Sequence, residues 1–324
     1  MEISTRGKAV LDIHKKEKLY SSSISFFKDK VILYSNYKDF VDEFNNSFRY
    51  MVEGERNSKG AKSFYLYREE DKSFNLVLPS FQNLHFEGRD ILFPLFTSLM
   101  NSFILPGLKD MLVFHSAAVS INDEGIIIPG EESTGKTTLT AALLEEGFTY
   151  FSDEYAGFDS NSLKLISYPK SLFMRDDSIK LFKEKEELIR SSPLYTYRNE
   201  YRWVVDPMKV FGMDIGKEVE VKFILFLVPN YFGKSAIKRI PSSEVLLRLL
   251  KTSRNSIYLK QEERKVFFGK ALSIVKRTVG YELTVGRPQE AASIVKNKLM
   301  YDEIKSEDEL KELDTIAEKV LSML

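Results

Sequence analysis

Residues Ile126 to Gly147 read IIIPGEESTGKTTLTAALLEEG, and the spacing of their glycines and lysine is that of a phosphate-binding loop. Four residues separate Gly130 from Gly135, and Lys136 and Thr137 follow directly. In a loop of this spacing, successive backbone N–H groups and the N-terminus of a helix face the phosphates of a nucleotide. The stretch therefore predicts a nucleotide site at the start of a helix.

The residues on either side of this loop predict the strand and the helix that it needs. Ile126 to Ile128 form a short β-branched run between glycine and proline, which is typical of a buried strand. After the loop, Leu139 and Leu143 keep helical spacing, and Gly147 stands where a helix C-terminus often has glycine. Strand, loop and helix thus follow one another in the required order.

The composition indicates a globular chain and gives no sign of a nucleic-acid partner. Its 324 residues, 43% of them hydrophobic, are enough for a sizeable core and for two domains. Lys+Arg and Asp+Glu each number 47, and no run of like charges is long enough for a nucleic-acid arm. The sequence has no cysteine, which excludes disulfides and a cysteine nucleophile. Its first residues contain no apolar segment of signal-peptide length, so we expect a cytoplasmic protein.

The uncharged segment ILFPLFTSLMNSFILPGL, residues 91–108, has a length that approaches a membrane span. Its apolar residues come in pairs, however, and polar residues fill the gaps, which is the pattern of an amphipathic helix. We expect a helix that begins near Pro94, ends near Pro106 and Gly107, and packs on the core; membrane contact is the weaker alternative.

The chain divides into two expected regions. Residues 1–108 alternate in short patches such as VILYS, SFYLYREE and FNLVLP, which predicts a strand-rich N-terminal region that ends in the amphipathic helix. No chemistry is expected there, because His14 and His85 lack acidic or histidine partners at ligand spacing. Residues 109–324 indicate one larger α/β unit, with strands in MLVFHSAAVS, FTYFSDE, LKLISYPKSLFM and VKFILFLVPNY and two closing helical segments, the first with Pro288 near its start.

Two adjacent carboxylates follow the strand after the loop helix. Asp153 and Glu154 come directly after it, where an open sheet presents its strand ends beside the loop. Adjacent acids at this place are suited to holding Mg²⁺ and to accepting a proton from a hydroxyl. His115, on the strand before the loop, is a third candidate, for which a structural role is an equal alternative.

At these residues the chain resembles HPr kinase/phosphorylase and its relatives, whose catalytic domain is also similar to that of ATP-dependent phosphoenolpyruvate carboxykinase. The motifs that carry the resemblance are FHSAAVS, GIIIPGEESTGKTTLTAALLEEGF, YFSDEYA and YPKSL, with VDP, FILFLVPNY and GYELTVGRPQEAASIV further on. They cover residues 109–300. The chain is most similar to stand-alone kinases of peptide natural-product pathways, some of which phosphorylate a C-terminal serine of lasso-peptide precursors.

The resemblance implies an α/β P-loop domain and a set of site residues. Lys136 is the implied phosphate lysine, His115 the implied histidine near the transferred phosphoryl group, and Thr137 with Glu154 the implied Mg²⁺ ligands. The implied nucleotide-binding residues are Gly130, Glu131, Glu132, Ser133, Thr134, Gly135, Lys136, Thr137 and Thr138. Which acid is the base stays open, and Asp153 is favoured because the family usually has two aspartates here, so that Glu154 is the position that departs.

The loop also departs from the similar proteins, which often have Gly-Glu-Ser-Gly-Ser-Gly-Lys-Thr. Glu132 and Ser133 stand in place of serine and glycine, so the backbone is less free and the local charge is more negative. Lys170 and Arg175, in YPKSLFMRDD, are further candidates for positive charge at the site, although at least one of them is expected to be an ordinary surface residue.

The expected function is an ATP- and Mg²⁺-dependent kinase that phosphorylates a serine of a peptide or small protein, with no nucleic-acid partner and no membrane span. The segments with which the bifunctional enzymes bind their carrier protein and remove its phosphate are not recognised here. Two alternatives stay open: a kinase of a small-molecule hydroxyl, and a nucleotide-binding regulatory module without an acceptor.

Overall fold

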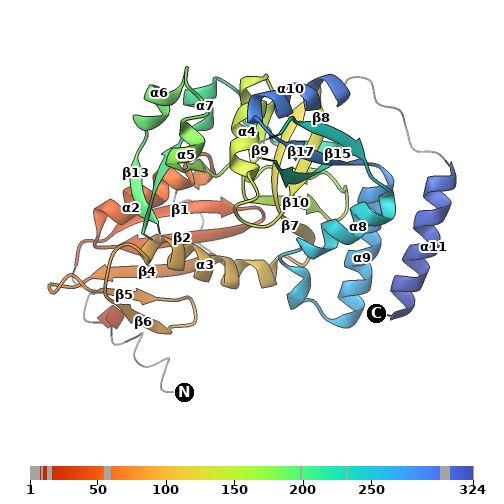
Figure 1. Ribbon diagram of the computed structural model, residues 1–324. Coiled ribbons are helices and arrows are strands. Elements are labelled where there is room, and N and C mark those ends of the chain that lie inside the picture. The colour runs from red at the N-terminus through yellow and green to blue at the C-terminus, as the bar shows by residue number, and fades with distance from the viewer. Residues whose placement is uncertain are drawn as a thin grey trace.

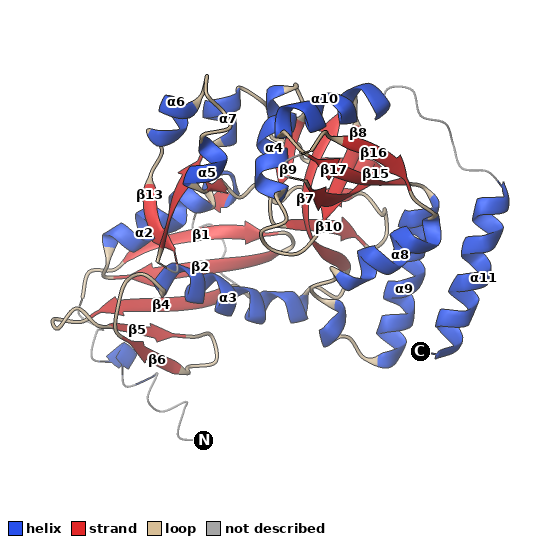
Figure 2. Ribbon diagram, in the orientation of Figure 1, coloured by secondary structure: helices blue, strands red, loops and turns tan. Residues whose placement is uncertain are grey.

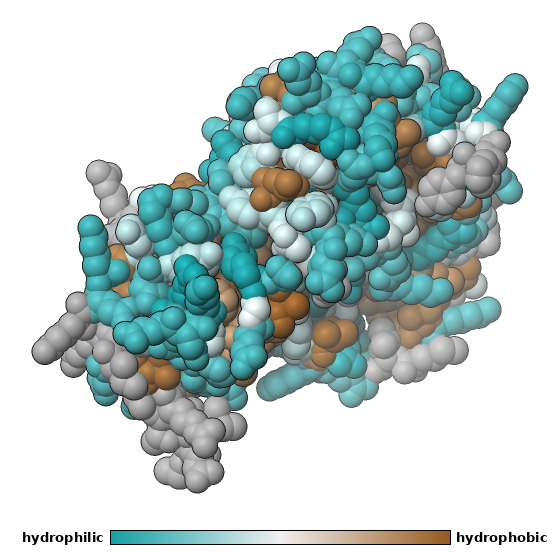
Figure 3. Space-filling view, turned by 60° about the vertical axis from the view of Figure 1, so that its left-hand side comes forward, coloured by the Kyte–Doolittle hydropathy of each residue, from teal (hydrophilic) through white to brown (hydrophobic). Residues whose placement is uncertain are grey.

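The computed structural model describes residues 8, 10–12, 17–54, 60–197, 199–230, 233–299 and 307–323. Within these ranges the chain forms three β-sheets and the helices around them (Figures 1 and 2). His14 lies outside the described residues. The face drawn in Figure 3 is mostly hydrophilic, with scattered hydrophobic side chains, as is usual for a folded protein.

The N-terminal region is built on a six-stranded sheet in the order β3-β1-β2-β4-β5-β6. Its strands are β1 (Tyr20–Phe26), β2 (Asp29–Ser35), β3 (Val52–Glu53), β4 (Lys62–Arg68), β5 (Phe74–Val77) and β6 (Asn83–Phe86). The strands expected in VILYS, SFYLYREE and FNLVLP are confirmed as β2, β4 and β5. Two helices pack on this sheet, α2 (Lys38–Ser47) and α3 (Leu92–Ile104), and the 3-10 turn η1 (Arg49–Met51) follows α2.

Helix α3 confirms the prediction made for residues 91–108. It begins two residues before Pro94, and the 3-10 turn η2 (Leu105–Gly107) ends it at the expected place. Phe93, Phe96 and Met100 are fully buried against the N-terminal sheet, because they lie on one face of the helix. Among the described residues, no helix is long and apolar enough to cross a membrane.

The second sheet has eight strands in the order β11-β10-β7-β8-β15-β17-β16, with β9 beside β7. The strands are β7 (Met111–Ile121), β8 (Glu124–Pro129), β9 (Thr149–Ser152), β10 (Tyr155–Asp159), β11 (Leu165–Ile166), β15 (Glu218–Pro229), β16 (Ala236–Arg239) and β17 (Val279–Val285). Strands β8, β15 and β17 run parallel. The expected strand at Ile126 to Ile128 is therefore confirmed as β8, at the centre of the sheet.

Helices cover both faces of this sheet, which explains the continuous isoleucine run in β8. Ile126 and Ile128 pack with helices α4 (Lys136–Glu145) and α10 (Pro288–Leu299). Ile127 points to the opposite face and packs in the core with α8 (Ser242–Lys251), α9 (Gln261–Lys276) and α11 (Glu307–Met323). All three side chains are fully buried, as is typical of a central parallel strand.

The remaining elements are inserted between strands of the eight-stranded sheet, most of them between β11 and β15. A three-stranded sheet has the order β12-β14-β13, from β12 (Leu172–Met174), β13 (Leu194–Tyr197) and β14 (Glu200–Val205). Short helices α5 (Asp176–Ile179), α6 (Glu186–Arg190) and α7 (Pro207–Phe211) accompany it, and the turn η3 (Ser256–Tyr258) joins α8 to α9. Of these elements, the sequence patterns predicted strand structure only at LKLISYPKSLFM, which contains β12; β13, β14 and the pair α8 and α9 were not predicted.

The core of the N-terminal region extends across residue 109. Met111, Val113, Tyr155 and Tyr168 pack in the same hydrophobic cluster as the side chains of α2, α3 and the six-stranded sheet. The boundary at residue 108 stays a prediction, and the two regions share buried side chains. The N-terminal region therefore lies beside Tyr155, the first residue of β10, which directly follows Asp153 and Glu154.

Candidate functional site

The predicted phosphate-binding loop joins β8 to α4, and its backbone is folded tightly around Lys136. Gly135 has φ +92° and Ser133 has φ +63°, so both residues adopt the left-handed conformation. Lys136 Nζ donates hydrogen bonds to the carbonyl oxygens of Gly130 at 2.8 Å and Glu131 at 2.6 Å. Similar sequences have glycine at the position of Ser133. The left-handed backbone conformation costs glycine little, but it is unfavourable for serine.

Two threonine side chains form hydrogen bonds that hold the loop, one within the loop and one to helix α5. Thr134 Oγ1 donates to the carbonyl of Glu131 at 2.9 Å, which closes the loop on itself. Thr138 Oγ1 lies 2.9 Å from Ser178 Oγ on α5. The side chains of Glu131 and Glu132 are exposed, in contrast to Lys136, which is only 6% exposed. Burial lowers the pKa of Lys136, while the carboxylates of Asp153 and Glu131 act in the opposite direction.

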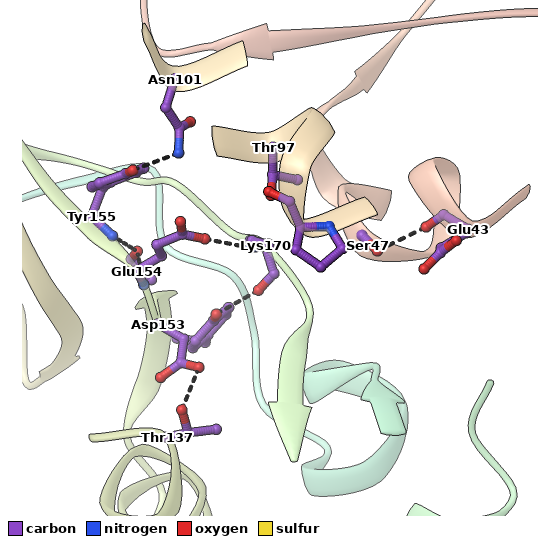
Figure 4. Close-up of polar contacts among 12 residues, drawn as sticks. Glu43, Ser47, Thr97, Asn101, Thr137, Asp153, Glu154, Tyr155 and Lys170 are labelled. Atoms are coloured by element: carbon purple, nitrogen blue, oxygen red, sulfur yellow. Dashed lines mark hydrogen bonds and ion pairs between the residues drawn. The ribbon is translucent and has the colours of Figure 1, made fainter. Parts of the chain in front are cut away.

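Asp153 lies beside the first turn of α4. Thr137 Oγ1 donates a hydrogen bond of 2.8 Å to Asp153 Oδ2 (Figure 4). Asp153 Oδ1 is buried and has no hydrogen-bond partner among the described residues. Burial raises the pKa of Asp153 to about 7, despite the hydrogen bond from Thr137 and the charge of Lys136. A buried carboxylate oxygen without a partner, next to a threonine hydroxyl at a phosphate loop, suits a Mg²⁺ ion, which takes few protein ligands beside phosphate oxygens.

Glu154 faces away from the loop and forms an ion pair with Lys170 (Figure 4). Lys170 is 9% exposed, and its ammonium group lies over the rings of Phe173 at 4.6 Å and Phe48 at 5.6 Å. Burial alone would raise the pKa of Glu154, but Lys170 outweighs it and the pKa is lowered. Glu154 is therefore ionised at pH 7, whereas Asp153, with a pKa of about 7, is only partly ionised there.

His115 lies on β7 directly opposite Tyr155 on β10, with the two rings 6.5 Å apart. Its Nε2 is buried and has no hydrogen-bond partner among the described residues. Burial lowers the pKa of His115 to about 4, and the charges of Lys136 and Arg254 add to this effect. The imidazole is neutral at pH 7 and lies within electrostatic range of both the loop lysine and Glu154.

Two arginines lie at the edges of the loop. Arg175 donates a hydrogen bond of 3.3 Å to Ser133 Oγ and forms an ion pair of 3.5 Å with Glu200. Arg254 comes from the turn between α8 and α9, and its guanidinium lies 3.9 Å from the carboxylate of Glu131. Sequence reasoning named Arg175 and missed Arg254, because Arg254 stands in a polar turn that shows no motif.

The N-terminal region contributes side chains and backbone to this site, although no chemistry was expected of it. Asn101 on α3 donates a hydrogen bond of 2.8 Å to the hydroxyl of Tyr155, the residue after Glu154 (Figure 4). Ser171, next to Lys170, binds the carbonyls of Asn46 and Ser47 in α2. His85 is exposed, and its ring lies 3.4 Å from Asn75 Oδ1 within the N-terminal sheet.

The described residues contain no group of three or more histidine, cysteine, aspartate or glutamate side chains that could hold a metal ion by themselves. The expected metal ligands, Thr137 and Glu154, are not hydrogen-bonded to each other, since Thr137 binds Asp153 instead. A metal ion at this site would need phosphate oxygens as further ligands.

Comparisons with known proteins find 49 chains of solved structures that are similar to this chain. One of them is the HPr(Ser) kinase/phosphatase from Coxiella burnetii, at 14% sequence identity and a TM-score of 0.30, over 58% of this chain and 96% of that chain. No protein-family model matches the sequence, and no curated protein matches it. We therefore base the proposed function on the geometry of this chain's own residues and on its sequence motifs.

Proposed function

We propose that the protein is an ATP-dependent kinase that transfers a phosphoryl group to a serine hydroxyl of a peptide or small protein. The observation that carries this proposal is the contact between the phosphate loop and the acid pair. Thr137, at the N-terminus of α4, donates a hydrogen bond to Asp153, and the next residue, Glu154, forms an ion pair with the buried Lys170. A phosphate site and a proton acceptor thus lie side by side, as phosphoryl transfer requires.

The loop residues bind and orient the nucleotide. Lys136 exchanges its hydrogen bonds with the carbonyls of Gly130 and Glu131 for phosphate oxygens, and the N–H groups at the start of α4 face the same phosphates. Thr137 and Asp153 would hold Mg²⁺, which neutralises charge on the phosphates when bound. Arg175 and Arg254 add positive charge at the two edges of the loop.

The environments of the two acids support distinct roles. Asp153 accepts the hydrogen bond of the loop threonine, which favours the metal-side role, and this leaves Glu154, which points away from the loop and is paired with Lys170, as the proton acceptor. This assignment is the reverse of the one favoured from the sequence. In the reaction the serine oxygen bonds to the γ-phosphorus and its proton passes to Glu154. The bond from the γ-phosphorus to the bridging oxygen breaks, and ADP leaves.

The acceptor is proposed from the resemblance of the motifs. A serine in a peptide is the main proposal, and the C-terminal serine of a lasso-peptide precursor is its finer form. A kinase of a small-molecule hydroxyl shares every residue of the site described above. A regulatory module without an acceptor would keep the loop but would not need an ionised Glu154 beside it.

Labelled ATP separates these functions. The wild-type chain and Lys136→Ala are incubated with Mg²⁺, labelled ATP and either serine-containing peptides or small hydroxyl compounds. Label transferred to peptide serine by the wild type alone supports the proposal. Label in a small molecule supports the second kinase, and nucleotide binding with no transfer to any acceptor supports the regulatory module.

A further inference from the structure

The turn between α8 and α9 presents two adjacent apolar side chains to solvent. Ile257 is 67% exposed and Tyr258 is 42% exposed. They lie in η3, at one end of the helix pair α8 and α9, whose helices pack side by side (Figure 1). Single exposed apolar residues are common, but two neighbours on one short turn form a small apolar surface that is available to a partner.

Hydrogen bonds hold this turn rigidly against β7. Asn255 is 1% exposed; its Oδ1 accepts from the N–H of Val113, and its Nδ2 donates to the carbonyls of Leu108 and Met111. The backbone of residues 252–254 also pairs with β7, through His115 N–H to the Thr252 carbonyl at 2.7 Å. These contacts anchor the backbone of the turn that carries the two exposed apolar side chains.

The same turn reaches the candidate active site. The guanidinium of Arg254 lies 3.9 Å from Glu131 of the phosphate loop. Ile257 is three residues further along the chain, so its Cα lies at most about 11 Å from that of Arg254. The charge of Arg254 also acts on Glu154, so an extended substrate whose serine lies at the acid pair would reach Ile257 within a few residues.

The charge around the turn is mainly positive. Residues 251–266 contain Lys251, Arg254, Lys260, Arg264 and Lys265, against only Glu262 and Glu263. Both acids have basic neighbours, since Glu263 forms an ion pair with Lys109 and Glu262 lies 3.7 Å from Lys265. The surface next to the apolar pair thus favours a partner with negative charge.

We infer that residues 252–259 are a docking site for the acceptor peptide, which carries an apolar side chain a few residues from its serine and acidic residues beside it. This inference rests on the proposed kinase function. Because the turn is already ordered, little conformational entropy is lost there when a peptide binds. A short peptide can therefore gain affinity from few contacts. Ile257 and Tyr258 contact the apolar side chain, and Lys260 and Arg264 attract the acidic residues.

Two random peptide libraries test the docking site on the full chain with Mg²⁺ and a non-hydrolysable ATP analogue. One library has serine at its centre and the other has alanine, which cannot accept phosphate. The wild type should select acidic and apolar residues in both. Ile257→Ser combined with Tyr258→Ser should weaken binding of the selected peptides by about tenfold, the loss expected when apolar contacts are removed. Lys260→Glu combined with Arg264→Glu should remove the selection for acidic residues.

The control is Val52→Ser, which removes an apolar side chain that is 43% exposed on β3 of the N-terminal sheet. It should leave the selection unchanged. The inference is overturned if the turn variants select the same peptides as the wild type, or if they convert a dimer into a monomer in sedimentation, which would make the turn a self-interface. Failure of the kinase proposal alone gives a different result. The protein then still binds selected peptides of the alanine library, but with labelled ATP in place of the analogue no label is transferred to the serine library.

Discussion

Replacing Asp153 by asparagine should stabilise the folded protein at alkaline pH while it impairs phosphoryl transfer. Burial raises the pKa of Asp153 to about 7, whereas an aspartate in an unfolded chain has a pKa of about 3.9. The folded state therefore holds a proton that the unfolded state has lost between these two pH values. Over this interval the stability of the wild type falls by about 1.4 kcal/mol per pH unit, or about 4 kcal/mol in all, and above pH 7 the full loss remains.

Asparagine has no charge to bury, and its side-chain oxygen still accepts the hydrogen bond from Thr137. At pH 8 the wild type carries the whole penalty, and at pH 5 only about 1 to 2 kcal/mol of it. The advantage of Asp153→Asn in the free energy of unfolding should therefore be about 2 to 3 kcal/mol larger at pH 8 than at pH 5. Denaturant titrations at both pH values, without metal or nucleotide, measure this difference, and titrating groups that do not interact with Asp153 cancel because both proteins share them. An equal advantage at the two pH values would refute the reasoning.

Glu154→Gln is the matched control, because the adjacent acid has a pKa shifted in the opposite direction. The pKa of Glu154 is lowered, so its ionised form stabilises the folded state above the ordinary pKa of glutamate, and this stabilisation is lost as the pH falls. At pH 8 the substitution leaves Lys170 buried without its carboxylate, which should cost about 3 kcal/mol or more. Neighbouring substitutions should thus change stability in opposite directions, while both reduce transfer.

Three further substitutions test the rest of the site. Lys136→Ala should lose nearly all transfer with its circular dichroism unchanged, and turnover within about tenfold of wild type would contradict the loop as the catalytic site. His115→Ala should reduce single-turnover transfer by about 10²-fold or more with little change in melting temperature, because His115 Nε2 leaves no partner behind among the described residues; an active but heat-sensitive variant would make it structural. Ser133→Gly should raise stability by up to about 1 kcal/mol, since φ +63° is strained for serine, and a lower melting temperature would contradict this reason.

The sequence predicted those parts of the fold in which local pattern and tertiary environment agree. The isoleucine run became β8 because both faces of that strand are covered, and α4 follows because Gly135 supplies the left-handed residue before it. The apolar pairs of residues 91–108 became the buried face of α3 for the same reason. In each case periodicity alone determines which side chains can be buried.

Long-range contacts at the site had no such signal. Arg254 lies at the loop because Asn255 binds three backbone groups near the start of β7, which are more than 140 residues away in the chain. The ammonium group of Lys170 lies over Phe48 because the next residue, Ser171, binds the end of α2 at Asn46 and Ser47. Neither contact can be read from spacing, since both depend on how two separately predicted regions share one core.

The acid pair shows why residue type alone did not assign the roles. Asp153 and Glu154 are adjacent in the turn between β9 and β10, so their side chains diverge into different surroundings. The first meets a neutral hydroxyl on α4, and its charge is mainly opposed by burial. The second meets an ammonium group that two aromatic rings also contact, one of them from the N-terminal region. The difference between the two carboxylates therefore comes from Lys170 and from the region that holds it, and the N-terminal region becomes a part of the proposed chemistry.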